Sequence, residues 1–164
     1  MSKINVTYDT REKLPWLFDH YSNFVVSKGT LKRGDYSIVG YEDKFSIERK
    51  RNTGELSLNI VAPRFEKELE ALQQYNISYV VCEFPFNYLE KFPAFSHIPP
   101  KKWSKLRINA KFLVKRITTF QEKYDKALVL NFQTLVLREE DKDDEEITTS
   151  MNNIGNVYFK LKNY

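Results

Sequence analysis

Three side chains suited to metal-dependent hydrolysis lie within residues 34–50. This segment reads GDYSIVGYEDKFSIERK, so that Asp35 precedes Glu48 and Lys50. Residues i and i+2 of a β-strand project to the same face, which places Glu48 and Lys50 together and turns Arg49 to the opposite side. If the chain folds back between them, the Asp35 carboxylate can converge on Glu48. Two carboxylates at one point suit Mg²⁺, which keeps several waters and takes further oxygens from substrate phosphates.

The elements that must position these groups are short strands separated by turn signals. We expect a strand at residues 36–41, a polar turn at 42–44 and an antiparallel partner at 45–50. An earlier strand over residues 3–8 leads directly to Asp9, so a further carboxylate stands at a strand end. These strands are expected to form the centre of a sheet.

The rest of the chain alternates between helical and strand patterns, which is typical of an α/β domain. The apolar run ISYVVC is typical of a buried parallel strand at residues 77–82. At 164 residues the chain is long enough for one domain with a substantial core. The remaining expected elements are a helix at residues 13–21, a strand at 24–27, a helix from Pro63 to about Asn76, a helix at 103–124, a strand at 127–132 and a helix at about 147–162.

The formal charge is unevenly distributed along the chain. Lys and Arg number 26 against 22 Asp and Glu, a net charge of +4, but the run EEDKDDEE at residues 139–146 holds seven acids and one Lys. The other residues therefore carry 25 basic and 15 acidic side chains, a net charge of +10. A body this basic favours a polyanionic partner.

A basic helix is expected at about residues 101–126. Its apolar residues from Trp103 to Tyr124 are spaced by three and four, which predicts one amphipathic helix. Nine basic and two acidic residues lie between Lys101 and Lys126, a net charge of +7. The basic face of this helix is either simply solvated or in contact with phosphates, and the sequence leaves both interpretations open.

The single cysteine, Cys82, excludes an intramolecular disulfide framework and suits a reducing compartment. It lies within an apolar strand, so we expect a core residue and not a nucleophile. The sequence has neither a basic-then-apolar leader nor a run of about 18 apolar residues. We therefore expect a soluble intracellular protein with no membrane partner, cytoplasmic in a phage or bacterium and nuclear in a eukaryote.

Four ordered motifs resemble the nuclease domain of the XPF and Hef structure-specific endonucleases, a branch of the PD-(D/E)XK superfamily. They lie within about residues 3–84 and are Asp9-Thr10-Arg11-Glu12, Gly34-Asp35-Tyr36, Ile47-Glu48-Arg49-Lys50 and Arg64-Phe65. The resemblance implies a restriction-endonuclease-like α/β fold, in which a central mixed sheet is flanked by helices. It also implies a divalent metal, Mg²⁺ or Mn²⁺, and cleavage of DNA at branched, flapped or forked structures, as in repair and recombination.

The matching motifs also imply roles for individual residues. Asp35 and Glu48 are implied as the principal metal ligands, with Asp9 as an additional acid at the site. Lys50 is implied to position or activate the attacking water. The supporting residues are Arg11 and Arg49, which orient the acids or contact the scissile phosphate, and Glu12.

Phosphodiesters are anionic and resist attack, so a bound cation is needed to neutralise developing charge and to lower the pKa of the attacking water. Carboxylates alone would repel such a substrate, whereas a metal ion together with Lys50 reverses the sign of the charge. Basic side chains elsewhere capture the DNA backbone over a wider area. The candidates for this contact are Arg11, Arg51, Arg64, Lys101, Lys102, Lys105 and Arg107.

One position departs from the family pattern. The family has an Asp a few residues after Glu-Arg-Lys, where this chain has Gly54 followed by Glu55. Glu55 is the candidate substitute, shifted by one residue. The sequence leaves its role open, and it also leaves open whether one or two metal ions bind.

Two functions of different classes fit the sequence. The favoured function is a metal-dependent DNA endonuclease. The alternative is a noncatalytic nucleic-acid-binding or scaffold subunit of a nuclease complex, since families of this kind include members that have lost activity. The chain after residue 138 is too short for the helix-hairpin-helix module usual in XPF-like enzymes. We therefore expect a single nuclease domain. The resemblance implies that this domain dimerises, either with itself or with a substrate-selecting subunit.

Overall fold

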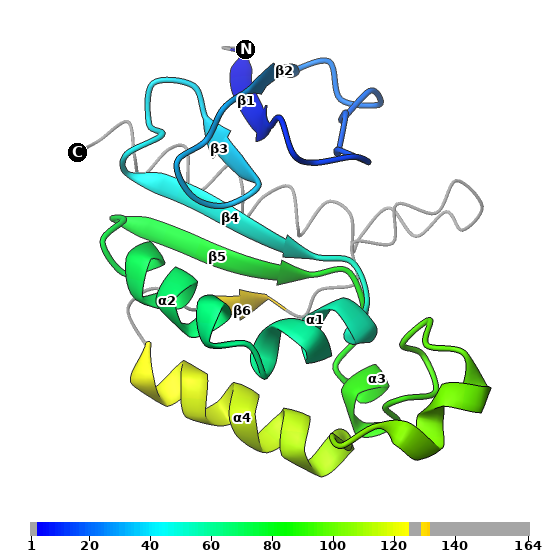
Figure 1. Ribbon diagram of the computed structural model, residues 1–164. Helices are drawn as coiled ribbons and strands as arrows, with labels where there is room; N and C mark the ends of the chain where they lie inside the picture. Colours follow the sequence, from blue (N-terminus) through cyan, green and yellow to red (C-terminus); the bar gives the residue numbers. More distant parts are fainter. Residues whose placement is uncertain (1–2, 125–128, 132–164) are drawn as a thin grey trace.

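The computed structural model describes residues 3–124 and 129–131, and it shows a mixed β-sheet with helices packed against it (Figure 1). The strands of this part of the chain are β1 (Ile4–Asp9), β2 (Phe24–Gly29), β3 (Tyr36–Ile38), β4 (Phe45–Lys50), β5 (Ile77–Cys82) and β6 (Val129–Asn131). Their spatial order is β2, β1, β3, β4, β5, β6. β3 is antiparallel to β1 and β4, and the other neighbours are parallel. The expected restriction-endonuclease-like α/β class is confirmed.

The helices follow from clear local signals. The described helices are α1 (Thr53–Ile60), α2 (Pro63–Leu72), α3 (Asn87–Glu90), the 3₁₀ helix η1 (Pro100–Lys105) and α4 (Ala110–Lys123). Asn52 caps α1 because its side chain accepts a hydrogen bond from the Glu55 N–H at 2.9 Å. Pro63 starts α2, where its missing N–H and fixed φ are tolerated. The sequence predicted α2 and missed α1, which is only eight residues long.

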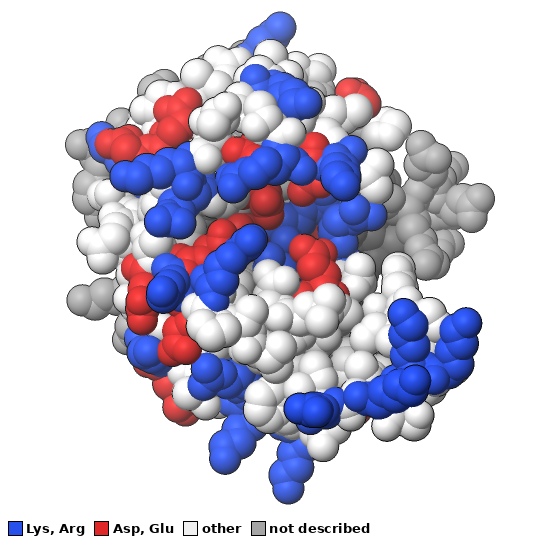
Figure 2. Space-filling view, viewed as in Figure 1, with Lys and Arg blue, Asp and Glu red and all other residues white. Residues whose placement is uncertain are grey.

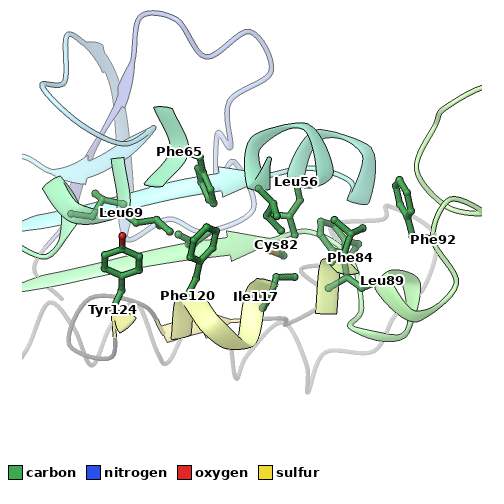
Figure 3. Close-up of a cluster of buried hydrophobic side chains, with 14 residues drawn as sticks. Leu56, Phe65, Leu69, Cys82, Phe84, Leu89, Phe92, Ile117, Phe120 and Tyr124 are labelled. Carbon is green, nitrogen blue, oxygen red and sulfur yellow. The ribbon is translucent and has the colours of Figure 1, made fainter. Parts of the chain in front are cut away.

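The larger hydrophobic core lies between these helices and one face of the sheet, which we call the helical face (Figure 3). β5 supplies Val80 and Cys82 to it, and both are almost completely buried. Burial raises the pKa of the Cys82 thiol to about 12, which confirms it as a core residue. The helices supply Leu56, Ile60, Phe65, Leu69, Leu72, Leu89, Leu113, Ile117 and Phe120.

The opposite face of the sheet, which we call the loop face, holds a second and smaller core. Within the described residues, the segment 10–23 covers this face with the buried side chains of Trp16 and Phe18. Trp16 stacks on Tyr36 of β3, with ring centroids 4.5 Å apart. The sheet therefore has a buried environment on both faces, and all six residues of β4 are buried.

The predicted helix at residues 13–21 is wrong. Trp16 and Phe18 are buried while Leu14 and Leu17 are exposed, so the burial does not follow a helical period. Pro15 disfavours the helical conformation at the residue before it. Phe18 has a φ of 55°, which is incompatible with a right-handed helix. These apolar residues belong to an irregular segment that covers the loop face, and they do not form the apolar stripe of a helix.

The predicted basic helix at about residues 101–126 is also wrong in its boundaries. Residues 100–105 form η1, and Leu106 is extended with a ψ of 130°. α4 begins after Asn109, whose side chain accepts a hydrogen bond from the Phe112 N–H at 2.9 Å. The basic residues before Asn109 therefore belong to a separate segment and not to the solvent face of one long helix.

The remaining predictions concern the ends of the sheet and the C-terminal part. The strands at residues 3–8, 24–27 and 77–82 and the antiparallel pairing of β3 with β4 are confirmed. The strand predicted at 36–41 is too long, because β3 ends at Ile38 and the turn begins at Val39. β6 confirms the central part of the strand predicted at 127–132. The acidic run and the C-terminal helix at about 147–162 lie outside the described residues. No helix in the described part of the chain has the length and apolar character needed to cross a membrane.

Candidate active site

The ends of three neighbouring strands bring the predicted acids together. The Asp9 N–H at the end of β1 donates to the backbone carbonyl of Asp35, just before β3, at 2.8 Å. In the next pair Tyr36 lies opposite Ile47, so Asp35 comes beside Glu48 of β4. Residues 9, 35 and 48 are far apart in the chain, and the strand order makes them neighbours across the sheet.

Glu48 and Lys50 share the helical face, as their spacing predicts. In the parallel register they lie beside Val80 and Cys82, both of which belong to the larger core. The Lys50 ammonium is 2.5 Å from a Glu48 carboxylate oxygen and 5.3 Å from the centre of the Phe65 ring on α2. The Glu48 side chain is only 8% exposed and the Lys50 side chain only 4%, so this ion pair is largely shielded from water.

Asp35 is anchored to the same strand end. Its Oδ2 accepts a hydrogen bond from the Arg49 backbone N–H at 2.7 Å. Burial raises the pKa of Asp35 to about 6, against the opposing effects of this hydrogen bond and of the Lys50 charge. The charges of Glu12 and Glu68 raise it further. Asp35 is therefore a carboxylate whose charged form the protein does not fully stabilise.

Glu48 is in the same electrostatic situation. Burial raises its pKa to about 7, Lys50 counteracts this, and the charges of Asp35 and Glu68 raise it. Burial lowers the pKa of Lys50, but its charge attraction and hydrogen bond to Glu48, together with the charges of Glu55 and Asp35, raise it overall. One ammonium thus serves several carboxylates. The arrangement leaves an excess of negative charge at the two acids that face each other.

These two acids fit a hard divalent cation. Within residues 3–124 and 129–131, no group of three or more His, Cys, Asp or Glu side chains is arranged to hold a metal ion. A cation here would rest on Asp35 and Glu48 and take its other oxygens from water and a substrate phosphate, as Mg²⁺ commonly does. Its charge would also favour the ionised forms of both acids, which burial and the neighbouring carboxylates disfavour.

Asp9 is aligned with this pair but its oxygens are already used. Oδ1 accepts from the Arg11 backbone N–H at 2.9 Å and from the Arg11 side chain at 2.5 Å, and Oδ2 accepts from the Leu31 N–H at 2.8 Å. These hydrogen bonds hold the pKa of Asp9 below its usual range even though burial opposes them. Asp9 therefore ties the turn after β1 to the loop before β3. Its assignment as a metal ligand stays a prediction.

Arg49 projects to the loop face, and its guanidinium is occupied there. It donates to the Leu14 carbonyl, the Tyr36 hydroxyl and the Glu83 carboxylate at 2.5, 3.3 and 2.9 Å, and it lies 5.0 Å from the Trp16 ring centre. Only 8% of its side chain is exposed, and its contact with the scissile phosphate stays a prediction. Arg49 acts on the acids through its backbone N–H, and Glu12 lies 3.6 Å from its guanidinium.

Glu55 lies at the edge of the site. One of its oxygens is 3.9 Å from the Lys50 ammonium, and the other accepts from the Arg51 N–H at 3.0 Å. A Cβ atom at Gly54 would lie 2.1 Å from the Ser96 carbonyl oxygen, so position 54 has no room for a side chain. The departure from the family motif thus has a steric cause, and Glu55 is the acid at this end of α1.

Basic side chains surround the acids. In the space-filling view, acidic side chains gather in a hollow near the centre of this face, and Lys and Arg side chains lie along its edges (Figure 2). Arg11, with 73% of its side chain exposed, follows β1. The other predicted DNA contacts, all exposed, are Arg51 before α1, Arg64 on α2, Lys101, Lys102 and Lys105 on η1, and Arg107 after it.

Three participants in this site were not assigned from the sequence. Glu68 on α2 acts on Asp35 and Glu48, and its place one helical turn after the Arg64-Phe65 motif gave no chemical signal. Glu83 and Trp16 form the partners of Arg49, and the Trp16 indole N–H donates to Glu83 at 2.5 Å. Since these two residues are 67 positions apart, only the fold brings them together.

The strand order and the row of polar groups define a restriction-endonuclease-like α/β domain. No family model and no curated protein matches the sequence. The chain is similar in structure to XPF from Aeropyrum pernix, with a TM-score of 0.53 and 18% identity over 77% of this chain and 51% of that chain. It is equally similar to XPF from Aeropyrum pernix in complex with DNA. The TM-score is 0.53, and the identity is 17% over 78% of this chain and 55% of that chain. The chain spans about half the length of these structures and has an XPF-like fold.

Proposed function

We propose that this protein is a divalent-metal-dependent DNA endonuclease that cleaves phosphodiester bonds at branched, flapped or forked DNA. The observation that carries the proposal is a pair of neighbouring carboxylates, the half-buried Asp35 and the buried Glu48, beside one buried ammonium, Lys50. A structural ion pair needs one acid for one base. A cation bound by both carboxylates would account for the second acid.

Each of these groups has a distinct part in the proposed reaction. Asp35 and Glu48 would hold Mg²⁺ or Mn²⁺, which would supply the Lewis acidity that polarises the scissile phosphate and lowers the pKa of the attacking water. Lys50 stays protonated beside Glu48 and places positive charge where the phosphorane develops negative charge. The Arg49 backbone N–H fixes one oxygen of Asp35, which leaves its other oxygen to the cation.

Two further observations support DNA as the substrate. Figure 2 shows acidic side chains in a hollow with Lys and Arg side chains along its edges, which is the charge pattern that captures a phosphate backbone and presents it to a metal site. One of the similar solved structures is XPF from Aeropyrum pernix in complex with DNA. The branched form of the substrate follows the family resemblance of the four motifs.

Cleavage assays with matched variants test the proposal. End-labelled flap, fork and duplex DNA are incubated with Mg²⁺ or Mn²⁺, with and without a chelator. We expect cleavage that requires the metal and is lost in Asp35→Asn, Glu48→Gln and Lys50→Met. The controls are Asp19→Asn and Lys44→Met, which change exposed residues outside the site and keep wild-type activity. Cleavage that persists in the chelator, or in Asp35→Asn, contradicts the proposal.

The alternative is a noncatalytic nucleic-acid-binding or scaffold subunit. It is favoured by one observation, the absence of a three-ligand metal group within the described residues. Binding of DNA is expected for both functions, because the basic side chains are the same. Only metal-dependent cleavage separates them. Dimerisation with a second copy or with a substrate-selecting subunit remains part of the proposal.

A further inference from the structure

The segment between β5 and α4, residues 85–109, carries exposed aromatic and basic side chains that the proposed catalytic chemistry does not use. We call it the arm. It contains α3 and η1 and extends beyond α1 at the end of the sheet (Figure 1). Its first half is anchored, because Leu89 and Phe92 belong to the larger core. The arm is therefore a fixed part of the fold, although it contributes little regular structure.

The arm is seated beside the active site through a backbone contact. The Ser96 carbonyl oxygen lies so close to Gly54 that a Cβ atom at residue 54 would be only 2.1 Å from it. Gly54 lies in the first turn of α1, four residues after Lys50. The Ser96 hydroxyl stabilises this bend by donating to the Pro93 carbonyl at 2.7 Å and accepting from the Ile98 N–H at 3.2 Å. This contact holds the bend of the arm at Ser96 against the first turn of α1, which directly follows the catalytic strand.

Trp103 on the outer part of the arm has a fixed and exposed ring. Its indole N–H donates to the Ile98 carbonyl at 2.8 Å, while 36% of the residue is exposed. The hydrogen bond holds the ring plane, so little side-chain freedom is lost when a ligand stacks on it. The other tryptophan, Trp16, is 5% exposed and packs on Tyr36, as core tryptophans do.

Cations immediately surround this ring in the sequence. Lys101, Lys102, Lys105 and Arg107 are all exposed, and no acid occurs from residue 100 to residue 109. An exposed indole among cations is the pattern with which proteins bind single-stranded nucleic acid, because every base offers a π-face and every nucleotide a phosphate. The same charge pattern disfavours a basic protein partner.

We propose that the arm binds an unpaired segment of DNA next to the cleavage site, with one base stacked on the Trp103 indole and the adjoining phosphates paired with Lys101, Lys102, Lys105 and Arg107. The inference rests on the proposed function for the identity of the nucleic acid, and it supplies the reason for a branched substrate. Duplex bases are already stacked on each other and cannot use the indole. Flap and fork DNA offer the free bases that can.

Binding without metal tests the inference separately from catalysis. Affinities for oligothymidylate, a flap and a matched duplex are measured in the presence of a chelator at several salt concentrations. We expect Trp103→Ala to weaken binding of oligothymidylate and of the flap about tenfold and to leave duplex binding within about twofold. Arg107→Ala is expected to weaken all three ligands and to reduce the salt dependence.

The control is Phe112→Ala, which removes an equally exposed aromatic ring from α4, outside the arm. It is expected to leave all three affinities unchanged. Equal losses for Phe112→Ala and Trp103→Ala, or an equal loss for duplex and single-stranded ligands in Trp103→Ala, overturn the assignment.

Tryptophan fluorescence provides a second readout that does not depend on affinity. Because Trp16 is buried and Trp103 is exposed, oligothymidylate is expected to quench emission in the wild type and not in Trp103→Phe. Absent quenching with intact metal-dependent cleavage of flap DNA refutes only the inference. Quenching without any cleavage supports the arm site and refutes only the proposed endonuclease.

Discussion

The two faces of β4 each carry a buried cation, and the two cations differ in how the surrounding acids balance their charge. On the loop face, Arg49 meets Glu83, a tyrosine hydroxyl, a backbone carbonyl and an indole ring, so its charge is well compensated. On the helical face, Lys50 has to serve Glu48 and Asp35 together, and both acids have raised pKa values. Residues 49 and 50 are neighbours in the chain, yet one is held in a balanced network and the other in an unbalanced one.

This difference separates a structural role from a chemical one. Buried charges that are fully paired stabilise a particular arrangement of the chain, and losing one partner is costly. Buried charges of one sign in excess weaken the fold unless a ligand of the opposite sign binds. The balanced side of β4 therefore predicts effects on stability, and the unbalanced side predicts effects on metal binding and catalysis.

The largest expected effect is the loss of stability in Arg49→Met. The change leaves the Glu83 carboxylate, whose side chain is 16% exposed, without its cation, which costs about 3–5 kcal/mol of unfolding free energy for a buried pair. Denaturation by urea measures the loss as a lower midpoint. The double variant Arg49→Met/Glu83→Gln should recover part of it. A loss below about 1 kcal/mol would place Arg49 among ordinary surface charges.

The next effect is the loss of cleavage in Asp35→Asn without loss of stability. Removing one of two facing carboxylates relieves their repulsion, so the unfolding midpoint at neutral pH stays the same or rises. Removing a proposed metal ligand should lower the cleavage rate about a hundredfold or more. Rates under single-turnover conditions and urea midpoints are measured on the same preparation. A lower urea midpoint for Asp35→Asn would contradict this prediction and would give Asp35 a structural role like that of Arg49.

The effect of pH on metal-induced stabilisation is expected to be smaller. Since folding raises the pKa values of Asp35 and Glu48, to about 6 and about 7, the folded state binds more protons than the unfolded state between about pH 4 and pH 7. The metal-free protein therefore loses stability at these groups as the pH rises through this window. A cation binds their charged forms, so the stabilisation by Mn²⁺ should grow over the same window.

Thermal melting with and without Mn²⁺ at about pH 5.5 and about pH 8 measures this difference. At about a hundred times the dissociation constant, the cation should stabilise the protein by about 2.7 kcal/mol at the higher pH and by less at the lower pH. The double variant Asp35→Asn/Glu48→Gln should show no pH-dependent response to Mn²⁺. A response of equal size at both pH values would show that Mn²⁺ does not bind through these two carboxylates.

The smallest effect is expected for Glu55→Gln. Glu55 touches Lys50 only at 3.9 Å and caps the Arg51 N–H with its other oxygen, which a glutamine can still do. Cleavage should fall less than about tenfold. A loss as large as in Asp35→Asn would show instead that Glu55 replaces the family aspartate as a ligand. The comparison of the two variants is made at one metal concentration.

The central hairpin and the row of acids could be predicted from the sequence because their signals are local. The two-residue period puts Glu48 and Lys50 on one face, and the turn before Phe45 brings Asp35 back beside them. The strand register then follows. The charge balance of Arg49 could not be predicted, since its partners Glu83 and Trp16 lie far away in the chain.

The errors in helix prediction have the same physical origin. Apolar residues at positions 14–18 satisfied a helical pattern, but tertiary packing buried only Trp16 and Phe18 and forced a positive φ at Phe18. The regular apolar spacing after Trp103 was interrupted by the cap at Asn109, which the pattern ignored. Gly54 departs from the family motif. The Ser96 carbonyl, which leaves no room for a side chain at this position, is visible only in three dimensions.

A crystal structure with bound Mn²⁺ tests the central claim most directly. Anomalous scattering identifies the ion, and the claim predicts one peak within coordination distance of the Asp35 and Glu48 carboxylates, about 2.0–2.3 Å from their oxygens. The peak should be absent in crystals of Asp35→Asn grown under the same conditions. Mn²⁺ bound elsewhere, with these two acids still hydrogen-bonded only to the protein, would contradict the account.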